Sequence, residues 1–86
     1  MEEGRLLDII EPETQVPAMT LGLIRQEKRD GKNVIYYRPI SPFTPPILVI
    51  AFGLMIKTKT NADEVILENY YLSNEINEIL EEIKND

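Results

Sequence analysis

Five basic residues lie within residues 21–40 of a chain that is otherwise acidic. The same stretch carries two adjacent tyrosines. Cations contact phosphate groups and aromatic rings stack on bases, so this combination is typical of a surface that binds a partner or a nucleic acid. The residues expected to form that surface are Arg25, Lys28, Arg29, Lys32, Tyr36 and Arg38.

The residues needed for catalysis are scarce. The chain has no histidine and no cysteine. Without a histidine, the usual general base that would activate Ser41 or Ser73 as a nucleophile is missing. The acid pairs at 63–64 and 81–82 could hold a hard cation, but their spacing matches no EF-hand loop. The four glycines are scattered and form no phosphate-binding loop. We therefore expect no catalytic residue, no metal and no cofactor. A carboxylate-based enzyme is the second alternative to the function given below.

Charge is divided unevenly along the chain. Residues 21–59 hold seven cations and two acids, a net charge of +5, whereas the remaining residues hold two cations and thirteen acids, a net charge of −11. Together they give the net charge of −6. Two interpretations stay open: the basic segment faces a partner, or it faces acidic parts of the same chain or of a second copy.

An Asp-Gly pair at residues 30 and 31 predicts that the basic segment forms a β-hairpin, with strands over 19–29 and 33–40. A two-residue turn would place Arg25 opposite Tyr36, whereas a three-residue loop would place it opposite Ile35. The sequence leaves this register open.

Residues 22–40, GLIRQEKRDGKNVIYYRPI, resemble the wing of winged-helix repressors of the ArsR type, in which a basic strand, a turn and a strand with two tyrosines recur. The resemblance implies nucleic-acid binding through this hairpin. The chain departs from that pattern ahead of the hairpin, because Pro12 and Pro17 leave no room for the helix-turn-helix that precedes a wing. The resemblance is confined to these residues and identifies no family.

The longest apolar run is ILVIAFGLMI, residues 47–56, and the polar KTKT follows it. A run that is apolar on both sides predicts a buried central strand over 47–59, with Gly53 at a bulge or a close backbone approach. The proline-rich loop over 41–46 precedes it, and its Phe43 is expected to fold back onto the core.

The C-terminal third allows two interpretations. In the first, a strand within EVILENYYL is followed by an amphipathic helix that is capped by Ser73 or Asn74. In the second, one long helix runs from about 61 to 84. The first is favoured because several large apolar side chains would point away from the apolar stripe of a long helix.

The predicted fold is α+β: an antiparallel β-meander of three to five strands with a C-terminal amphipathic helix. The chain is expected to form one domain, with an N-terminal segment and connector over 1–17, a mainly β part over 18–72 and the helix over 73–86.

The apolar run also predicts self-association. A single helix can cover only one face of such a strand, and soluble monomers seldom expose several large apolar side chains in one patch. A second copy would supply the missing layer. The residues predicted for this oligomer interface are Leu48, Ile50, Phe52 and Leu54.

The expected function is therefore that of a non-catalytic small interaction protein, which acts as a homo-oligomer and binds another protein. Nucleic-acid binding through the basic hairpin 21–40 is the alternative. The ten-residue apolar run falls short of the ~20 residues that cross a membrane, and the N-terminus MEEGRLLDII lacks the pattern of a secretory signal. No membrane association and a cytoplasmic location are expected.

Overall fold

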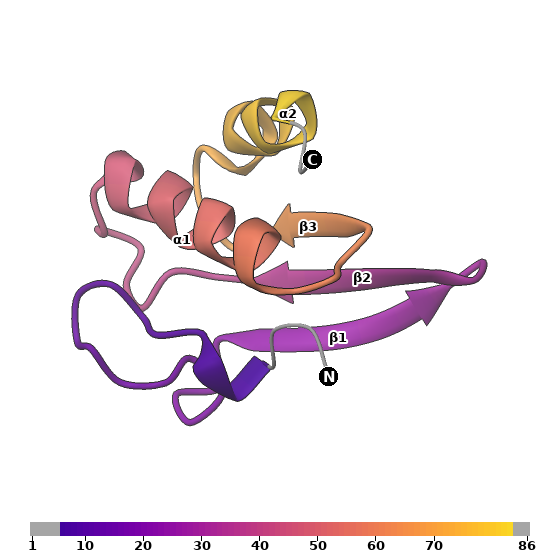
Figure 1. Ribbon diagram of the computed structural model, residues 1–86. Helices are drawn as coiled ribbons and strands as arrows, with labels where there is room; N and C mark the ends of the chain where they lie inside the picture. The colour runs from indigo at the N-terminus through magenta and orange to yellow at the C-terminus, as the bar shows by residue number, and fades with distance from the viewer. Residues whose placement is uncertain (1–5, 84–86) are drawn as a thin grey trace.

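The computed structural model describes residues 6–83 and has an α+β architecture, in which a mixed three-stranded sheet carries two helices (Figure 1). The strand order in the sheet is β1-β2-β3. The first two strands are antiparallel, and β3 runs parallel to β2 after a crossover through α1. The elements are η1 (Leu6–Asp8), β1 (Ile24–Arg29), β2 (Lys32–Tyr37), α1 (Pro46–Lys59), β3 (Glu64–Leu67) and α2 (Ser73–Glu82).

The predicted hairpin is present, with shorter strands than expected. Asp30 and Gly31 both adopt positive φ angles, of 53° and 80°, as a two-residue hairpin turn requires. This turn fixes the register that the sequence left open, and Arg25 lies opposite Tyr36. β1 begins only at Ile24, because turns occupy the residues before it.

The strand predicted over 47–59 is wrong: these residues belong to the 14-residue helix α1. A run that is apolar on every side suits a buried helix as well as a buried strand. Pro46 stands at the start of α1, where its fixed φ angle favours a helix and its missing N–H is not needed. The helix also provides the crossover that two parallel strands need. For this reason the sheet is mixed, and the antiparallel meander is wrong as well.

The main core lies between α1 and the sheet. Val49, Phe52 and Ile56 face inward from α1 and are fully buried. The ring of Tyr37 on β2 meets that of Phe52 edge-on, with centroids 5.0 Å apart. Its hydroxyl donates a hydrogen bond of 2.8 Å to the carbonyl of Val49, and burial raises the pKa of this phenol. The tyrosine therefore stays protonated, and keeps this bond, to a higher pH than an exposed tyrosine would.

Gly53 makes this packing possible. A β-carbon on Gly53 would lie 2.5 Å from the Tyr37 hydroxyl and 2.9 Å from a methyl group of Leu80 on α2. The close backbone approach predicted for this glycine is confirmed, although it occurs in a helix and not in a strand.

The N-terminal segment contributes to the same core. Ile9 and Ala18 are fully buried, and residues 10 and 17 form an isolated β-bridge. The buried carboxylate of Glu11 accepts hydrogen bonds from the backbone N–H groups of Glu13 and Thr14. These bonds hold the turn over residues 11–14. Residues predicted to be a connector therefore complete one end of the core.

The C-terminal third follows the first of its two interpretations, a strand and then a helix, and a single helix from 61 is wrong. α2 begins at Ser73 with Leu72 at its N-cap, so neither predicted cap residue holds that position. Ile76 and Leu80 of α2 are buried, and the helix lies alongside α1 and beyond the β3 edge of the sheet (Figure 1). Residues 84–86 of the predicted helix lie outside the described part. Within residues 6–83, neither helix has the length and apolar character needed to cross a membrane.

The strand face predicted as an oligomer interface does not exist, because its residues belong to a helix. Phe52 points into the core with 1% of its surface exposed, while Leu48, Ile50 and Leu54 are partly buried around other sides of α1. Phe43 was expected on the core and is instead 89% exposed. Its loop is held by its own turn, in which the Ser41 hydroxyl accepts a hydrogen bond from the Phe43 amide.

Candidate functional site

The six residues predicted for a partner surface do not all share one side of the sheet. The register places Arg25, Arg29 and Tyr36 on the face opposite α1. Alternation along the strands puts Lys32 and Arg38 on that face too, and Lys28 on the other. We refer to the side of the sheet opposite α1 as the open face.

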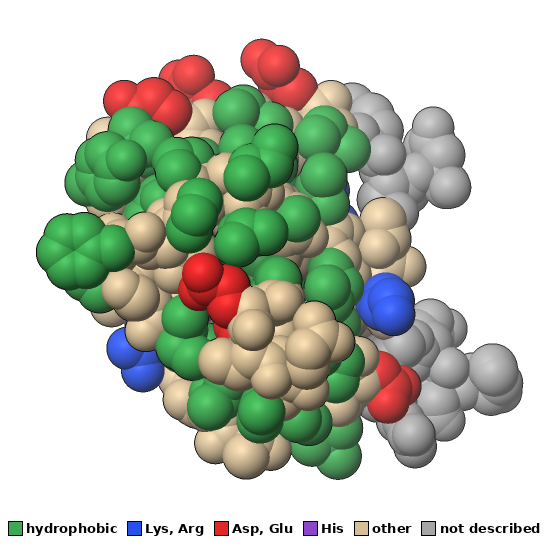
Figure 2. Space-filling view, turned by 90° about the vertical axis from the view of Figure 1, so that its left-hand side faces the viewer, with side chains coloured by type: hydrophobic (Ala, Val, Ile, Leu, Met, Phe, Trp, Pro, Cys, Tyr) green, Lys and Arg blue, Asp and Glu red, His purple; other side chains and the backbone are tan. Residues whose placement is uncertain are grey.

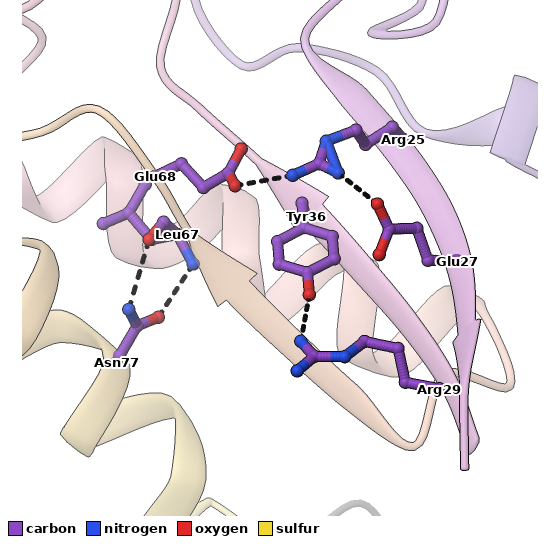
Figure 3. A network of polar contacts seen from close by, with 7 residues as sticks. All are labelled: Arg25, Glu27, Arg29, Tyr36, Leu67, Glu68 and Asn77. Carbon is purple, nitrogen blue, oxygen red and sulfur yellow. Dashed lines mark hydrogen bonds and ion pairs between the residues drawn. The ribbon is translucent and has the colours of Figure 1, made fainter. Parts of the chain in front are cut away.

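Arg25 is held on the open face by three contacts (Figure 3). Its guanidinium carbon lies 4.1 Å from the ring centroid of Tyr36, in a cation–π arrangement. Its two terminal nitrogens donate hydrogen bonds of 2.7 Å, one to Glu27 on the same strand and one to Glu68 after β3. Two carboxylates therefore balance the charge of Arg25, and the side chain lies flat on the tyrosine.

Tyr36 is covered as a result. Arg29 donates a hydrogen bond to its hydroxyl, and this bond raises the pKa of the arginine. Tyr36 is only 8% exposed and Val34 on the same strand is 2% exposed, although no described helix packs on this face (Figures 1 and 3). The guanidinium group of Arg25 thus covers the Tyr36 ring.

This geometry does not suit nucleic-acid binding. A base cannot stack on Tyr36 while Arg25 occupies the ring, and a phosphate would have to displace Glu27 and Glu68 from Arg25. The guanidinium of Arg38 is also engaged, since it donates a 3.1 Å hydrogen bond to the carbonyl of Gly22.

A second surface is apolar and lies at the end of the molecule where α1 begins. The three most exposed large hydrophobic side chains within residues 6–83 are Phe43 (89%), Tyr71 (74%) and Ile47 (73%). Thr44 brings them together: it follows Phe43, it lies just before α1, and its carbonyl accepts a hydrogen bond from the hydroxyl of Tyr70. Figure 2 looks on this end and shows hydrophobic side chains over much of it, with few charged ones between them. We call Phe43, Ile47 and Tyr71 the end patch.

A third feature is a groove of about 400 Å³ along the outer edge of β3, between that strand and α2. At one end of it, the amide side chain of Asn77 pairs with the main chain of Leu67 (Figure 3). The Asn77 oxygen accepts the Leu67 N–H at 2.8 Å, and the Asn77 nitrogen donates to the Leu67 carbonyl at 3.2 Å. Asn77 therefore takes the place of a neighbouring strand at this residue.

Three of the acids considered as cation ligands in the sequence, Asp63, Glu64 and Glu81, line this groove. In the described part of the chain, however, no three acidic side chains are grouped closely enough to hold a metal ion. The sequence did not reveal the groove or the end patch, because both depend on which elements become neighbours. The sequence signal for the end patch was Phe43, an aromatic residue in the proline-rich loop SPFTPP, but it was interpreted as a core residue.

Comparisons with models of protein families, with curated proteins and with solved structures found no match for this chain.

Proposed function

We propose that this chain is a non-catalytic interaction protein that assembles with a second copy of itself through the end patch. The observation that carries the proposal is that the three most exposed large apolar side chains belong to segments that the Tyr70–Thr44 hydrogen bond joins where α1 begins. Exposed apolar patches mark interaction sites, and aromatic side chains supply much of the binding energy at protein interfaces.

Net charge opposes self-association, which must therefore rest on apolar burial. Each chain carries a net charge of −6, so two copies repel each other over most of their surfaces. The end patch consists of three uncharged side chains, and a twofold contact places the same patch on both sides of the interface. Burying two apolar patches there gains free energy.

Light scattering at micromolar concentration tests this proposal. The expected mass is twice the 9.9 kDa of the chain. Replacing Phe43 by Ser should give a mass near that of one chain while the fold is kept, because this side chain contributes almost nothing to the core. Phe52 is unsuitable for such a test, because its replacement would disrupt the core of the monomer itself.

Leu7→Ser is the matched control, since Leu7 is also an exposed apolar residue but lies on η1. It should leave the mass doubled. A single-chain mass for the unmodified protein would refute the proposal, and so would equal dissociation by the Leu7 and Phe43 substitutions. Circular dichroism of each variant shows whether its fold is intact.

A further inference from the structure

The outer edge of β3 is protected at one residue and open at another. In a strand, successive residues direct their main-chain groups to alternate sides. The N–H and carbonyl of Leu67 point outward, where Asn77 binds them, so those of Val65 also point outward. Val65 lines the groove, whereas Asn77 closes the edge at Leu67. One outward-facing residue of the edge is therefore presented in a groove of about 400 Å³.

The groove has the form that an added strand requires. Its walls are the edge of β3 on one side and α2 on the other, and its lining includes the apolar side chain of Leu80. An extended peptide in this position would exchange main-chain hydrogen bonds with Val65 and place alternate side chains toward α2. The opposite edge of the sheet, β1, is less suited to this role, because five of its six side chains are exposed and all five are charged or polar.

Charge indicates what kind of peptide the groove accepts. The residues that line it include three acids, Asp63, Glu64 and Glu81, and one lysine, Lys57. The carboxylate of Asp63 accepts a 2.7 Å hydrogen bond from the backbone N–H of Asn33, so it is turned toward β2. Three acids against one lysine around the groove favour a cationic occupant, and the net charge of −6 attracts the same partner at long range.

We infer that the groove beside β3 binds an extended, lysine- or arginine-bearing peptide segment of another protein, which adds to the sheet as a strand next to Val65. This site lies away from the end patch and does not depend on self-association. It gives the chain a second interaction, with a basic partner in an extended conformation.

A capped peptide of alternating valine and lysine tests the inference, with ¹⁵N-labelled protein observed by NMR. The expected result is a saturable shift of the Val65 amide resonance as peptide is added. A peptide with proline in place of valine keeps the charge but loses every second main-chain N–H and fits poorly into a sheet, so it should bind far more weakly. A valine–glutamate peptide should not bind.

Two exposed glutamates on α2 provide a matched pair of variants. Glu81→Lys reverses a charge in the groove and should weaken binding of the valine–lysine peptide on the order of fivefold. Glu78→Lys makes the same change outside the groove and should have a much smaller effect.

Three results would overturn the inference: no shift at Val65, equal binding of the proline peptide, or equal effects of the two glutamate variants. A shift of the Val65 resonance on concentrating the protein alone would assign the groove to a second copy of this chain, and would also overturn it. The peptide titrations report on the groove alone. A negative result there would leave the light-scattering result for the end patch unchanged.

Discussion

Gly53 is the residue at which α1 comes closest to its neighbours in the core. The Tyr37 hydroxyl on one side and the Leu80 methyl groups on the other leave no space for a β-carbon. Glycine is a poor residue for the middle of a helix, so its presence in α1 reflects this packing. The same contact leaves the Tyr37 hydroxyl free to donate its hydrogen bond to the Val49 carbonyl.

Replacing Gly53 by Ala should destabilise the protein. Overpacking costs about 1–3 kcal/mol, while alanine gains about 1 kcal/mol over glycine in a helix, so the net loss in the free energy of unfolding should reach about 2 kcal/mol. Urea denaturation measures it.

A double-mutant cycle tests the cause of that loss. In a Tyr37→Phe background the nearest clashing atom is gone, so Gly53→Ala should cost much less than in the unmodified protein. Equal costs in both backgrounds would show that the hydroxyl is not the obstacle.

At the scale of elements, each edge of the sheet has its own protection. β1 carries charged side chains along its length, which discourages pairing with another strand. β3 is only four residues long, and Asn77 of α2 binds its outer edge. One side chain therefore fixes α2 to the sheet and also covers part of the edge.

Replacing Asn77 by Ala should lower the free energy of unfolding by about 1–3 kcal/mol, because the Leu67 N–H and carbonyl lose their partners. Hydrogen exchange at the Leu67 amide should accelerate by more than at the inward-facing strand amides. The neighbouring substitution Glu78→Ala, at an exposed position, is the control and should change stability by no more than about 0.5 kcal/mol. If the two substitutions had the same effect, the Asn77 amide would not be holding the edge.

At the scale of the whole molecule, an ion pair joins the basic hairpin to the acidic remainder of the chain. Arg25 of the hairpin bonds to Glu68, which lies 43 residues further along the chain. On the open face, the basic segment therefore contacts an acidic residue of its own chain. The end patch and the groove beside β3 remain as surfaces for other molecules.

We therefore expect no binding of short single- or double-stranded oligonucleotides at moderate salt, as measured by fluorescence anisotropy. Releasing Arg25 by the double substitution Glu27→Gln and Glu68→Gln should produce weak binding that falls steeply as salt rises, because it frees a cation and removes two negative charges. Steep, salt-sensitive binding by the unmodified protein would contradict this prediction and restore nucleic-acid binding as its function.

Local chemistry alone determined two parts of this fold. The Asp-Gly pair fixed the hairpin, because few other residue pairs adopt two successive positive φ angles. The spacing of Ile76 and Leu80 predicted α2, because an amphipathic period needs no knowledge of the partner surface. Separating β3 from α2 was also within reach, since the apolar side chains of residues 64–72 do not follow the stripe of a helix.

Tertiary structure decided the rest. Residues 47–56 are apolar on every side, so their periodicity could not distinguish a buried strand from a buried helix. The pairing of β3 with β2 in parallel required a crossover, and α1 supplied it. The two candidate surfaces follow from the same arrangement, because Thr44 and Tyr70, like Leu67 and Asn77, come close only once the chain is folded. Contacts between residues distant in sequence leave no periodic pattern along the chain, and for that reason the sequence predicted the hairpin and the last helix but neither surface.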